Sequence, residues 1–298
     1  MGTKVKKTRI PACGPAFILG LALVLALFAA GEIYTSYNRL TVREYRIDAS
    51  YIEGPVTLCL ISDLHDHRFG EKNAELAARI RDCQPDLILM AGDIINGDSA
   101  DPCAATELIR ALRDIAPVCY SLGNQEMAYI NAGRSDLKRE LEEAGALLLE
   151  ETYTDIAVGN NKICLGGMYG YAFAHDGGGH MYKEGIPGER LAFLESFQKQ
   201  DAFKIMMAHR PDSFIFGQAA DTWDIDLVLS GHLHGGQVIL PFLGGLFAGD
   251  QGFFPGYVYG EHHFRAVKTM IITSGLGSDR EKLPRFNNPP EVVKIVLE

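Results

Sequence analysis

The chain has 298 residues, of which 47% are hydrophobic, and this is enough to bury a substantial core. Its formal net charge is −10, and removing the four positive charges of the first nine residues leaves −14 for the remainder. An acidic body repels polyanions, so we expect no nucleic-acid partner.

The N-terminal segment predicts a membrane anchor. Its basic part, residues 1–15, holds Lys4, Lys6, Lys7 and Arg9, and an apolar run follows from Phe17 to Tyr34. A run of about 18 residues is near the lower limit for crossing a bilayer. We therefore expect a single-pass transmembrane helix at residues 16–37, with the basic end in the cytoplasm and the following domain outside it. A cleaved signal peptide is the alternative, because small residues at 29–31 would suit a cleavage site.

The next part of the chain alternates short apolar runs with helical patterns. Strands are expected at 56–62, 87–92 and 118–122, and helices at 73–83, 102–115 and 135–144. Leu76, Ala77 and Ile80 show the helical spacing in the first of these helices. Pro102 is expected at the first helical position of the second, after Asp101 as its N-cap. The alternation predicts right-handed crossovers and a largely parallel first sheet.

The second half offers further strands. They are expected at 162–168, 204–208, 227–230, 269–273 and 292–297. A helix is expected at 188–200, with Leu191, Leu194 and Phe197 on one face. Together the two halves indicate an α/β fold of two sheets covered by helices.

Seven metal-capable side chains stand at the ends of predicted strands. They are Asp63, His65, Asp93, Asn124, His209, His232 and His234. Imidazole and carboxylate suit Mn, Fe, Zn or Co, and a bridging carboxylate can hold two ions about 3.5–4 Å apart. Gly92, Gly123 and Gly231 precede ligands and permit tight turns there. A lone His or Gly-Asp is usually structural, so the prediction of a two-metal phosphoesterase rests on the whole set.

The order of these blocks resembles the calcineurin-like metallophosphoesterase superfamily. They read Asp63-Leu64-His65, Gly92-Asp93, Gly123-Asn124-Gln125-Glu126, His209 and Gly231-His232-Leu233-His234. The longer strings at 209–212, 230–238 and 289–293 are similar to the membrane-associated YkuE-like branch. The resemblance covers a catalytic domain at residues 44–298 and implies the αββα sandwich, a metallophosphoesterase fold of two sheets with outer helices.

The resemblance also implies the role of each ligand. Asp63, His65 and His234 would hold one divalent ion, Asn124, His209 and His232 the other, and Asp93 would bridge them. It further implies that Asn124, Gln125 and His209 are the catalytic residues.

Gln125 departs from the family, which has His at this position. Glutamine can donate a hydrogen bond to a phosphoryl oxygen but cannot transfer a proton. His67, or His175 and His180 in a glycine-rich loop, could supply the missing acid. Diesters with acidic leaving groups would suffer least from its loss.

We therefore expect a membrane-anchored, metal-dependent hydrolase of phosphodiester or pyrophosphate bonds. The resemblance implies that some relatives cleave the pyrophosphate of UDP-2,3-diacylglucosamine, which makes a lipid-linked substrate a candidate here. The alternatives are a broad phosphomonoesterase, a nucleotide phosphodiesterase, or a weakly catalytic metal-binding module at the membrane.

Three further features leave alternatives open. The apolar stretch 239–259 is either a hairpin covering a sheet edge or a surface that enters the bilayer or receives a lipid tail. Arg280 and Arg285 either reach a substrate phosphate or are solvated. Cys59, Cys119 and Cys164 lie in apolar strand runs and are expected to be buried free thiols.

Overall fold

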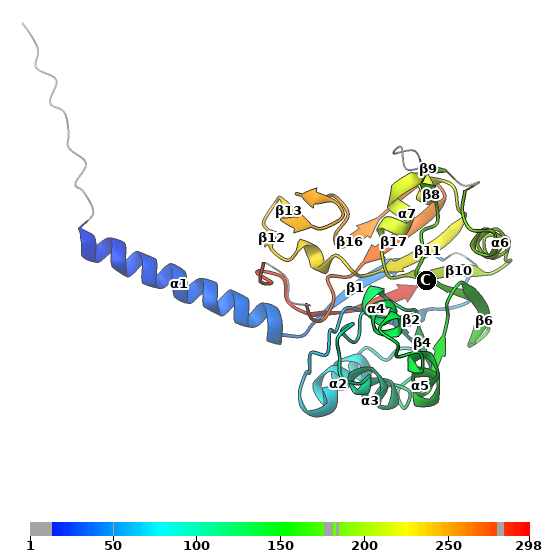
Figure 1. Ribbon diagram of the computed structural model, residues 1–298, viewed down its shortest axis with the longest axis horizontal. Coiled ribbons are helices and arrows are strands. Elements are labelled where there is room, and N and C mark those ends of the chain that lie inside the picture. Colours follow the sequence, from blue (N-terminus) through cyan, green and yellow to red (C-terminus); the bar gives the residue numbers. More distant parts are fainter. Residues whose placement is uncertain (1–13, 50, 176–180, 183–184, 279–282) are drawn as a thin grey trace, which may run out of the picture.

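The computed structural model describes the chain except for residues 1–13, 50, 176–180, 183–184 and 279–282. Two six-stranded sheets form its centre (Figure 1). The first sheet has the order β1 (Thr41–Ile47), β18 (Glu291–Leu297), β2 (Val56–Ile61), β3 (Leu87–Met90), β4 (Val118–Tyr120) and β5 (Ala146–Leu148). The second has the order β16 (Gly260–His262), β17 (Val267–Ile272), β11 (Ile225–Ser230), β10 (Phe203–Ala208), β7 (Asn161–Met168) and β6 (Thr152–Val158).

The first sheet is parallel except where β18 meets β2. In the second sheet β7, β10, β11 and β17 are parallel, while β6 and β16 are antiparallel edge strands. Every residue of β10 and β11 is buried, as expected for central parallel strands covered on both faces.

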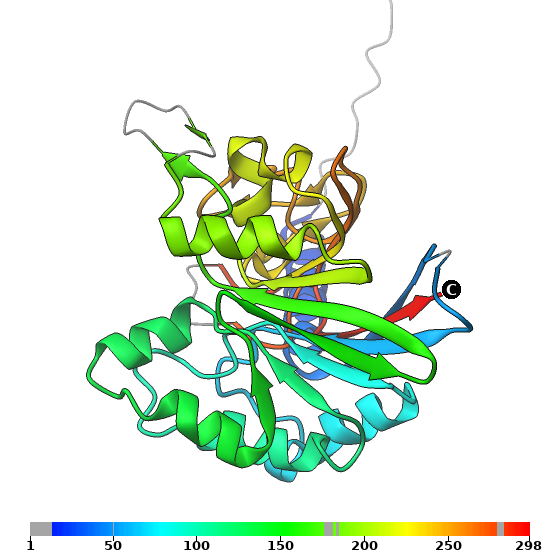
Figure 2. The ribbon, with the colours of Figure 1, turned by 90° about the vertical axis from the view of Figure 1, so that its right-hand side faces the viewer.

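Helices cover the outer face of each sheet, as Figures 1 and 2 show. On the first sheet lie α2 (Ala74–Asp82), α3 (Cys103–Leu112) and α5 (Leu137–Ala144), and their buried faces join one apolar cluster. On the second lie α6 (Gly188–Phe197) and the single turn α7 (Asp212–Ile215). A third apolar cluster fills the space between the sheets, with Leu58 and Leu60 on one side and Ile205 and Leu227 on the other. This arrangement confirms the predicted αββα sandwich.

The predicted elements agree with the observed ones to within a few residues at their ends. Pro102 is an exception, because it lies just before α3, where Asp101 accepts a hydrogen bond from the Cys103 N–H at 2.9 Å. The buried face of α6 holds Phe193 together with two of the three expected residues, Leu194 and Phe197. The first sheet begins at Thr41, three residues before the expected domain start.

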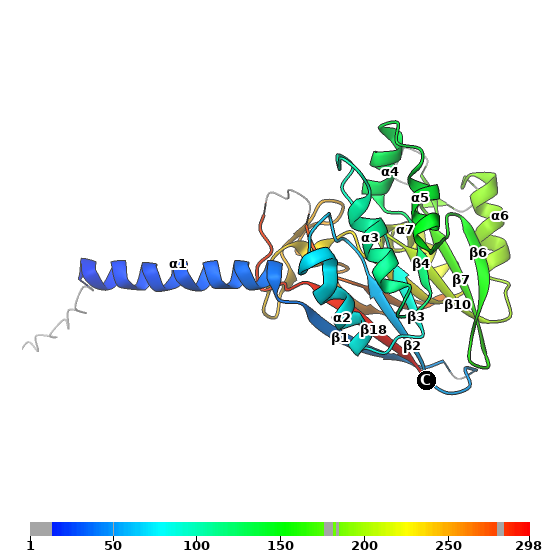
Figure 3. The same ribbon diagram turned by 90° about the horizontal axis from the view of Figure 1, so that it is seen from below.

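Helix α1 (Pro15–Asn38) projects from the body by itself (Figures 1 and 3). It is long and apolar enough to cross a membrane, and its most apolar 18-residue window is 0% buried. Its one buried residue, Ser36, lies at the end that joins the body. The basic cluster of residues 1–9 lies outside the described residues. Cys59, Cys119 and Cys164 are buried free thiols, as predicted.

Candidate metal centre

All seven predicted ligands lie beyond the carboxyl ends of strands, at one edge of both sheets. Asp63 and His65 follow β2, Asp93 follows β3, and Asn124 opens helix α4 (Asn124–Asn131) directly after β4. His209 follows β10, and His232 and His234 follow β11. Since the two sheets pack face to face, these strand ends meet, and ligands that are 171 residues apart in the sequence come into one site.

The first cluster joins Asp63, His65 and His234. Their ligand atoms lie within 4.8 Å of one another, and all three side chains are buried. Oδ1 of Asp63 is 3.9 Å from Nε2 of His65 and 3.8 Å from Nε2 of His234. Two ligands of one ion, each about 2.0–2.2 Å from it, stand roughly 3–4 Å apart. The spacing therefore suits a shared divalent ion.

The second cluster joins Asp93, His209 and His232, with Asn124 beside them. Nε2 of His209 is 3.2 Å from Oδ2 of Asp93 and 3.1 Å from Oδ1 of Asn124. Oδ2 of Asp93 is also 4.0 Å from Nε2 of His65, which belongs to the first cluster. Asp93 thus faces both clusters, as the bridging role requires.

The Nε2 atom of His65 is buried and has no hydrogen-bond partner among the residues that the structure describes. A buried polar atom without a partner costs about 1–3 kcal/mol, so a native structure needs a reason to keep one. A cation between Asp63, His65 and His234 would give this lone pair its partner. The residues present therefore fit a bound metal ion.

The other ring nitrogens orient these ligands. Nδ1 of His65 lies 2.9 Å from Oδ1 of Asn96, Nδ1 of His209 lies 2.7 Å from the Ala91 carbonyl, and Nδ1 of His234 lies 3.2 Å from the Gly277 carbonyl. Because each Nδ1 is engaged by an oxygen, Nε2 is the ring nitrogen that faces the centre.

Backbone conformation at the centre is unusual. Five of the ligands have positive φ although none is glycine, namely Asp63, His65, Asp93, His232 and His234. Each such residue costs of order 1 kcal/mol or more, and such strain concentrates where the surroundings impose a functional geometry.

The neighbouring glycines are needed mainly for space. A Cβ on Gly123 would lie 2.1 Å from Oδ1 of Asp93, and one on Gly231 would lie 2.2 Å from Oδ2 of Asp63. Among the three glycines predicted to make turns here, Gly92 has a positive φ, +82°. Any side chain at these positions would displace a ligand.

Protonation differs between the clusters in the metal-free protein. Burial lowers the pKa of His234 to about 3, so this imidazole is neutral and ready to bind a cation. Burial also acts against a charge on His209, but the adjacent Asp93 outweighs it and raises the pKa of His209 to about 9. A cation in the second cluster would therefore replace a proton.

A cavity of about 370 Å³ opens over the second cluster. Its lining includes Asn124, His232, Arg210 and Asp250. Asp250 pairs with Nη2 of Arg210 at 2.7 Å and with Nε2 of His232 at 3.2 Å. The guanidinium of Arg210 lies over the ring of Tyr171, 5.1 Å from its centroid.

Arg210 and Asp250 were not predicted as site residues from the sequence. Arg210 could have been identified from its position directly after the predicted ligand His209. Asp250 is 40 residues further along the chain, so its position gave no such signal.

Gln125 lies on the first turn of α4. Its Oε1 accepts a hydrogen bond from the Gly97 N–H at 2.8 Å, and its own N–H donates to Oδ1 of Asp93 at 2.8 Å. The side chain is thus directed toward the loop after β3. His67 contacts the ring of Phe69 and is not among the residues that line the cavity. The side chains of His175 and His180 lie outside the described residues.

The structure contradicts both alternatives that the sequence left open for Arg285, a phosphate contact and a solvated side chain. It is 0% exposed, and its guanidinium donates to the carbonyl oxygens of Ser274, Gly275, Gly277 and Asn288. Burial lowers its pKa to about 10. Arg285 therefore holds the loop behind the first cluster and is neither solvated nor available to substrate. Arg280 lies outside the described residues.

Glu126 is a second buried residue that supports the centre. It is 0% exposed, and its carboxylate accepts hydrogen bonds from the N–H groups of Asp93, Ile94 and Gly123 and from the hydroxyl of Tyr120. The sequence showed it only as a member of the Gly-Asn-Gln-Glu block. Four donors on one carboxylate fix the two loops that carry Asp93 and Asn124.

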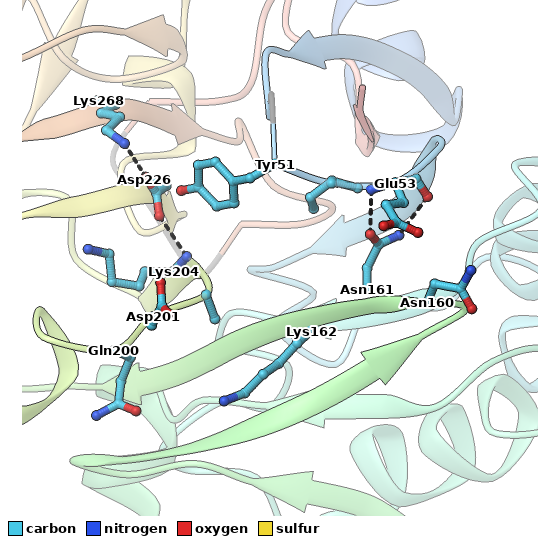
Figure 4. A pocket seen from close by; sticks show the side chains of 12 residues that line it. Tyr51, Glu53, Asn160, Asn161, Lys162, Gln200, Asp201, Lys204, Asp226 and Lys268 are labelled. Atoms are coloured by element: carbon cyan, nitrogen blue, oxygen red, sulfur yellow. Dashed lines mark hydrogen bonds and ion pairs between the residues drawn. The ribbon is translucent and has the colours of Figure 1, made fainter.

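The structure also has a larger cavity of about 560 Å³ at the opposite, amino-terminal ends of the strands (Figure 4). Three lysines there are each paired with a carboxylate: Lys268 with Asp226, Lys204 with Asp224, and Lys162 with Asp155. The charges are neutralised locally, and the metal clusters lie at the other end of the sheets. This cavity is therefore a poor candidate for the active site.

Comparison with known proteins agrees with this geometry. The model of the calcineurin-like phosphoesterase family matches residues 56–236, which include all seven ligands. A metallophosphoesterase of Caenorhabditis elegans, F40B5.2, is 26% identical over 264 residues, 85% of this chain and 52% of that protein. The chain thus spans about half the length of that relative.

Two bacterial proteins are similar as well. The phosphodiesterase YaeI of Escherichia coli is 27% identical over 251 residues, 82% of each chain. The metallophosphoesterase YkuE of Bacillus subtilis is 35% identical over 97 residues, 32% of this chain and 31% of that protein. The second match is compatible with the predicted branch but covers only a third of the chain.

Proposed function

Because the chain belongs to the calcineurin-like phosphoesterase family, we propose that it is a membrane-anchored hydrolase of phosphodiester or pyrophosphate bonds that uses two divalent ions. The observation that carries this proposal is the buried Nε2 of His65 in the first carboxylate–histidine cluster, which has no hydrogen-bond partner within the described part of the chain. When bound, the ions would supply a water of lowered pKa and positive charge for the phosphoryl oxygens. Asp63, His65 and His234 would hold one ion, Asn124, His209 and His232 the other, with Asp93 between them.

Arg210 is the side chain best placed to bind the phosphate. It lines the cavity beside Asn124 and His232, and its guanidinium is held by Asp250 and the ring of Tyr171. A planar guanidinium can donate two hydrogen bonds to a phosphoryl group. We propose that Asp250 keeps Arg210 oriented until substrate arrives.

The site favours substrates whose leaving group needs no proton. Gln125 cannot act as an acid, and its Oε1 is engaged by Gly97. Phosphodiesters with acidic alcohols and pyrophosphates, which release a phosphate, meet this condition. YaeI is named a phosphodiesterase, which is in line with this proposal. The anchor adds a reason to expect a lipid-linked substrate.

The test is Mn²⁺-dependent hydrolysis of bis(p-nitrophenyl) phosphate by the full chain in detergent. Asp93→Asn should abolish turnover, while Asp114→Asn, on an exposed loop, should leave it unchanged. Folded, metal-loaded protein without turnover would instead support the metal-binding module. Turnover of soluble nucleotides together with failure on lipid-linked pyrophosphates would support a nucleotide phosphodiesterase.

We also propose that the catalytic domain lies outside the cytoplasm, because the basic cluster precedes α1. Protease added to right-side-out spheroplasts should digest the domain. Protection of the domain in intact spheroplasts, with digestion only after lysis, would place it in the cytoplasm and refute this orientation.

A further inference from the structure

Two hairpins beside the metal cavity carry an exposed apolar surface. The first joins β12 (Ile239–Leu240) to β13 (Gly244–Gly245), and the second joins β14 (Phe247–Ala248) to β15 (Gly252–Phe253). Phe242 at the first tip is 107% exposed, and Phe253 on the second is 70% exposed. In water such side chains would be left unburied at a cost of about 1.5–3 kcal/mol each. A surface of this kind marks a binding site for an apolar partner.

The hairpins also lack charge on their outer side. Between Ile239 and Gly260 the chain has one charged residue, Asp250. That carboxylate binds Arg210 and His232 and is therefore directed toward the cavity. A surface that met water or a polar protein would be expected to carry more charge than this.

The hairpins lie at the end of the body from which α1 projects, as Figures 1 and 3 show, and Figure 2 views the helix behind them. Two hydrogen bonds fix the helix end to the body. The N–H of Asn288 donates to Oγ of Ser36 at 3.1 Å, and the N–H of Arg285 donates to the hydroxyl of Tyr37 at 3.3 Å. The body is thus held against the helix and does not hang from a loose linker.

A contact further up the helix sets the depth of this surface. The rings of Phe28 and Phe286 lie 6.5 Å apart in an edge-to-face arrangement. Phe28 precedes Tyr34 by six residues, which is about 9 Å of helix at 1.5 Å per residue. If the apolar run of α1 spans the bilayer, Phe286 lies about 9 Å inside its edge.

Hydrogen bonds join Phe286 to the start of the first hairpin, so this end of the hairpin lies at the same depth. Its carbonyl accepts a hydrogen bond from the Ile239 N–H at 3.1 Å, and its N–H donates to the Gln237 carbonyl at 3.1 Å. These bonds join Phe286 to the start of β12. The tip residues Phe242 and Leu243 follow within four residues of that bond.

We propose that the hairpins of residues 239–254 insert into the membrane leaflet next to the C-terminal end of α1, so that the metal cavity opens at the lipid surface. The partner is the lipid bilayer itself, and apolar insertion of this kind is usual for proteins that lie in a membrane interface. Phe247 and Ala248 of the second hairpin line the cavity together with His232 and His234. The headgroup phosphate of a lipid in that leaflet would reach the site without leaving the membrane. This last step rests on the proposed hydrolase function, whereas insertion rests on the contacts of Phe286 with α1 and β12 and on α1 as the membrane anchor.

Tryptophan fluorescence tests the insertion in the full chain. The protein is reconstituted in phosphatidylcholine–phosphatidylglycerol vesicles, with or without bromine on the acyl chains, since bromine quenches a tryptophan that it contacts. Trp223, the single native tryptophan, is 1% exposed in the apolar cluster that contains α6 and α7 and gives a constant background. The probes are Phe242→Trp at the hairpin tip, Leu23→Trp in α1 as the membrane control, and Tyr51→Trp at the opposite end of the strands as the water control.

The expected result is loss of fluorescence in brominated vesicles for Leu23→Trp and Phe242→Trp but not for Tyr51→Trp. Quenching at Leu23 without quenching at Phe242 would overturn the insertion, and it would mean that water or another protein covers the hairpins. Absence of quenching at both positions would overturn it too, because α1 would not span the bilayer. The readout needs neither metal nor turnover, so a failure of insertion is distinguishable from a failure of the proposed hydrolase activity.

Discussion

Glu126 offers the sharpest test of how the metal centre is held. Its buried carboxylate accepts hydrogen bonds from the N–H groups of Asp93 and Ile94 at 2.8 Å and of Gly123 at 2.9 Å, and from the Tyr120 hydroxyl at 2.7 Å. Burial raises the pKa of Glu126, and the negative charge of the nearby Asp93 adds to this effect. The four donors act in the opposite direction, because they favour the charged form. If the donors prevail, the charge is part of the structure.

Replacing Glu126 by Gln keeps the shape and tests the charge. An amide nitrogen in place of Oε2 would face the donors of Asp93 and Gly123 and lose both bonds. An amide nitrogen in place of Oε1 loses only the bond from Ile94, because the Tyr120 hydroxyl can rotate and accept. A bond to a charged group contributes about 1.5–3 kcal/mol and a neutral one about 0.5–1.5 kcal/mol. One lost bond and two weakened ones, offset by easier burial, give a loss of about 2–4 kcal/mol.

The assay is unfolding by urea of the metal-free chain in mild detergent, followed by the fluorescence of Trp223. Glu142→Gln is the matched control, because Glu142 is exposed on α5 and should change stability by no more than about 0.5 kcal/mol. We also expect Glu126→Gln to weaken Mn²⁺ binding by about 10–100-fold, as is usual for residues that orient ligands. A loss of stability below about 1 kcal/mol would refute the reasoning, since it would mean that Glu126 is already neutral.

Three further predictions concern the same region. Arg285→Met leaves several buried carbonyls without donors and should reduce the free energy of unfolding by about 3–5 kcal/mol, with little change in KM. Unchanged stability with a raised KM would instead show that Arg285 contacts the substrate phosphate. Because His209 keeps its proton below a pKa of about 9, the affinity of the metal-free protein for Mn²⁺ should rise by up to about tenfold per pH unit from neutral pH toward that value and then level off, as measured by titration calorimetry. A flat profile would show that no proton is displaced. Gln125→His should raise kcat on phenyl phosphate by roughly 10²-fold, the lower end of general-acid effects, with a much smaller gain on p-nitrophenyl phosphate. No change in kcat on either ester would count against an acid role at this position.

Much of the fold could be predicted from sequence because its strands are short, apolar and followed by polar ligands. β2, β3 and β4 were located by this pattern alone, and each predicted strand ended within two residues of the observed end. The ligand set could be predicted for the same reason, since Asp63, His65 and the other five stand where strands end. What brings them together is sheet topology, which local patterns do not contain.

The missed features depend on contacts between distant segments. Arg285 looked exposed because it lies in a polar, proline-rich stretch, and its burial arises only when the loop at 274–277 folds around it. Asp250 is a lone acid in an apolar hairpin, and its role follows from pairing with Arg210, 40 residues away. The edge strand β6 was not predicted, and its residues are only partly buried or exposed, so it lacks the continuous apolar run of the central strands. Hairpins in the stretch 239–259 were one of the two expected alternatives.

Gln125, Arg210 and the apolar hairpins restrict the proposed substrate in complementary ways. An amide at position 125 supplies no proton, which favours a leaving group that is stable as an anion. Arg210 offers positive charge next to His232, where a second phosphate of a pyrophosphate would be neutralised. Inserted as we propose, the hairpins would place this charge beside the lipid phase. A lipid attached through a pyrophosphate satisfies all three conditions. A soluble monoester with an alcohol leaving group has no second phosphate, no leaving group that is stable as an anion and no apolar chain.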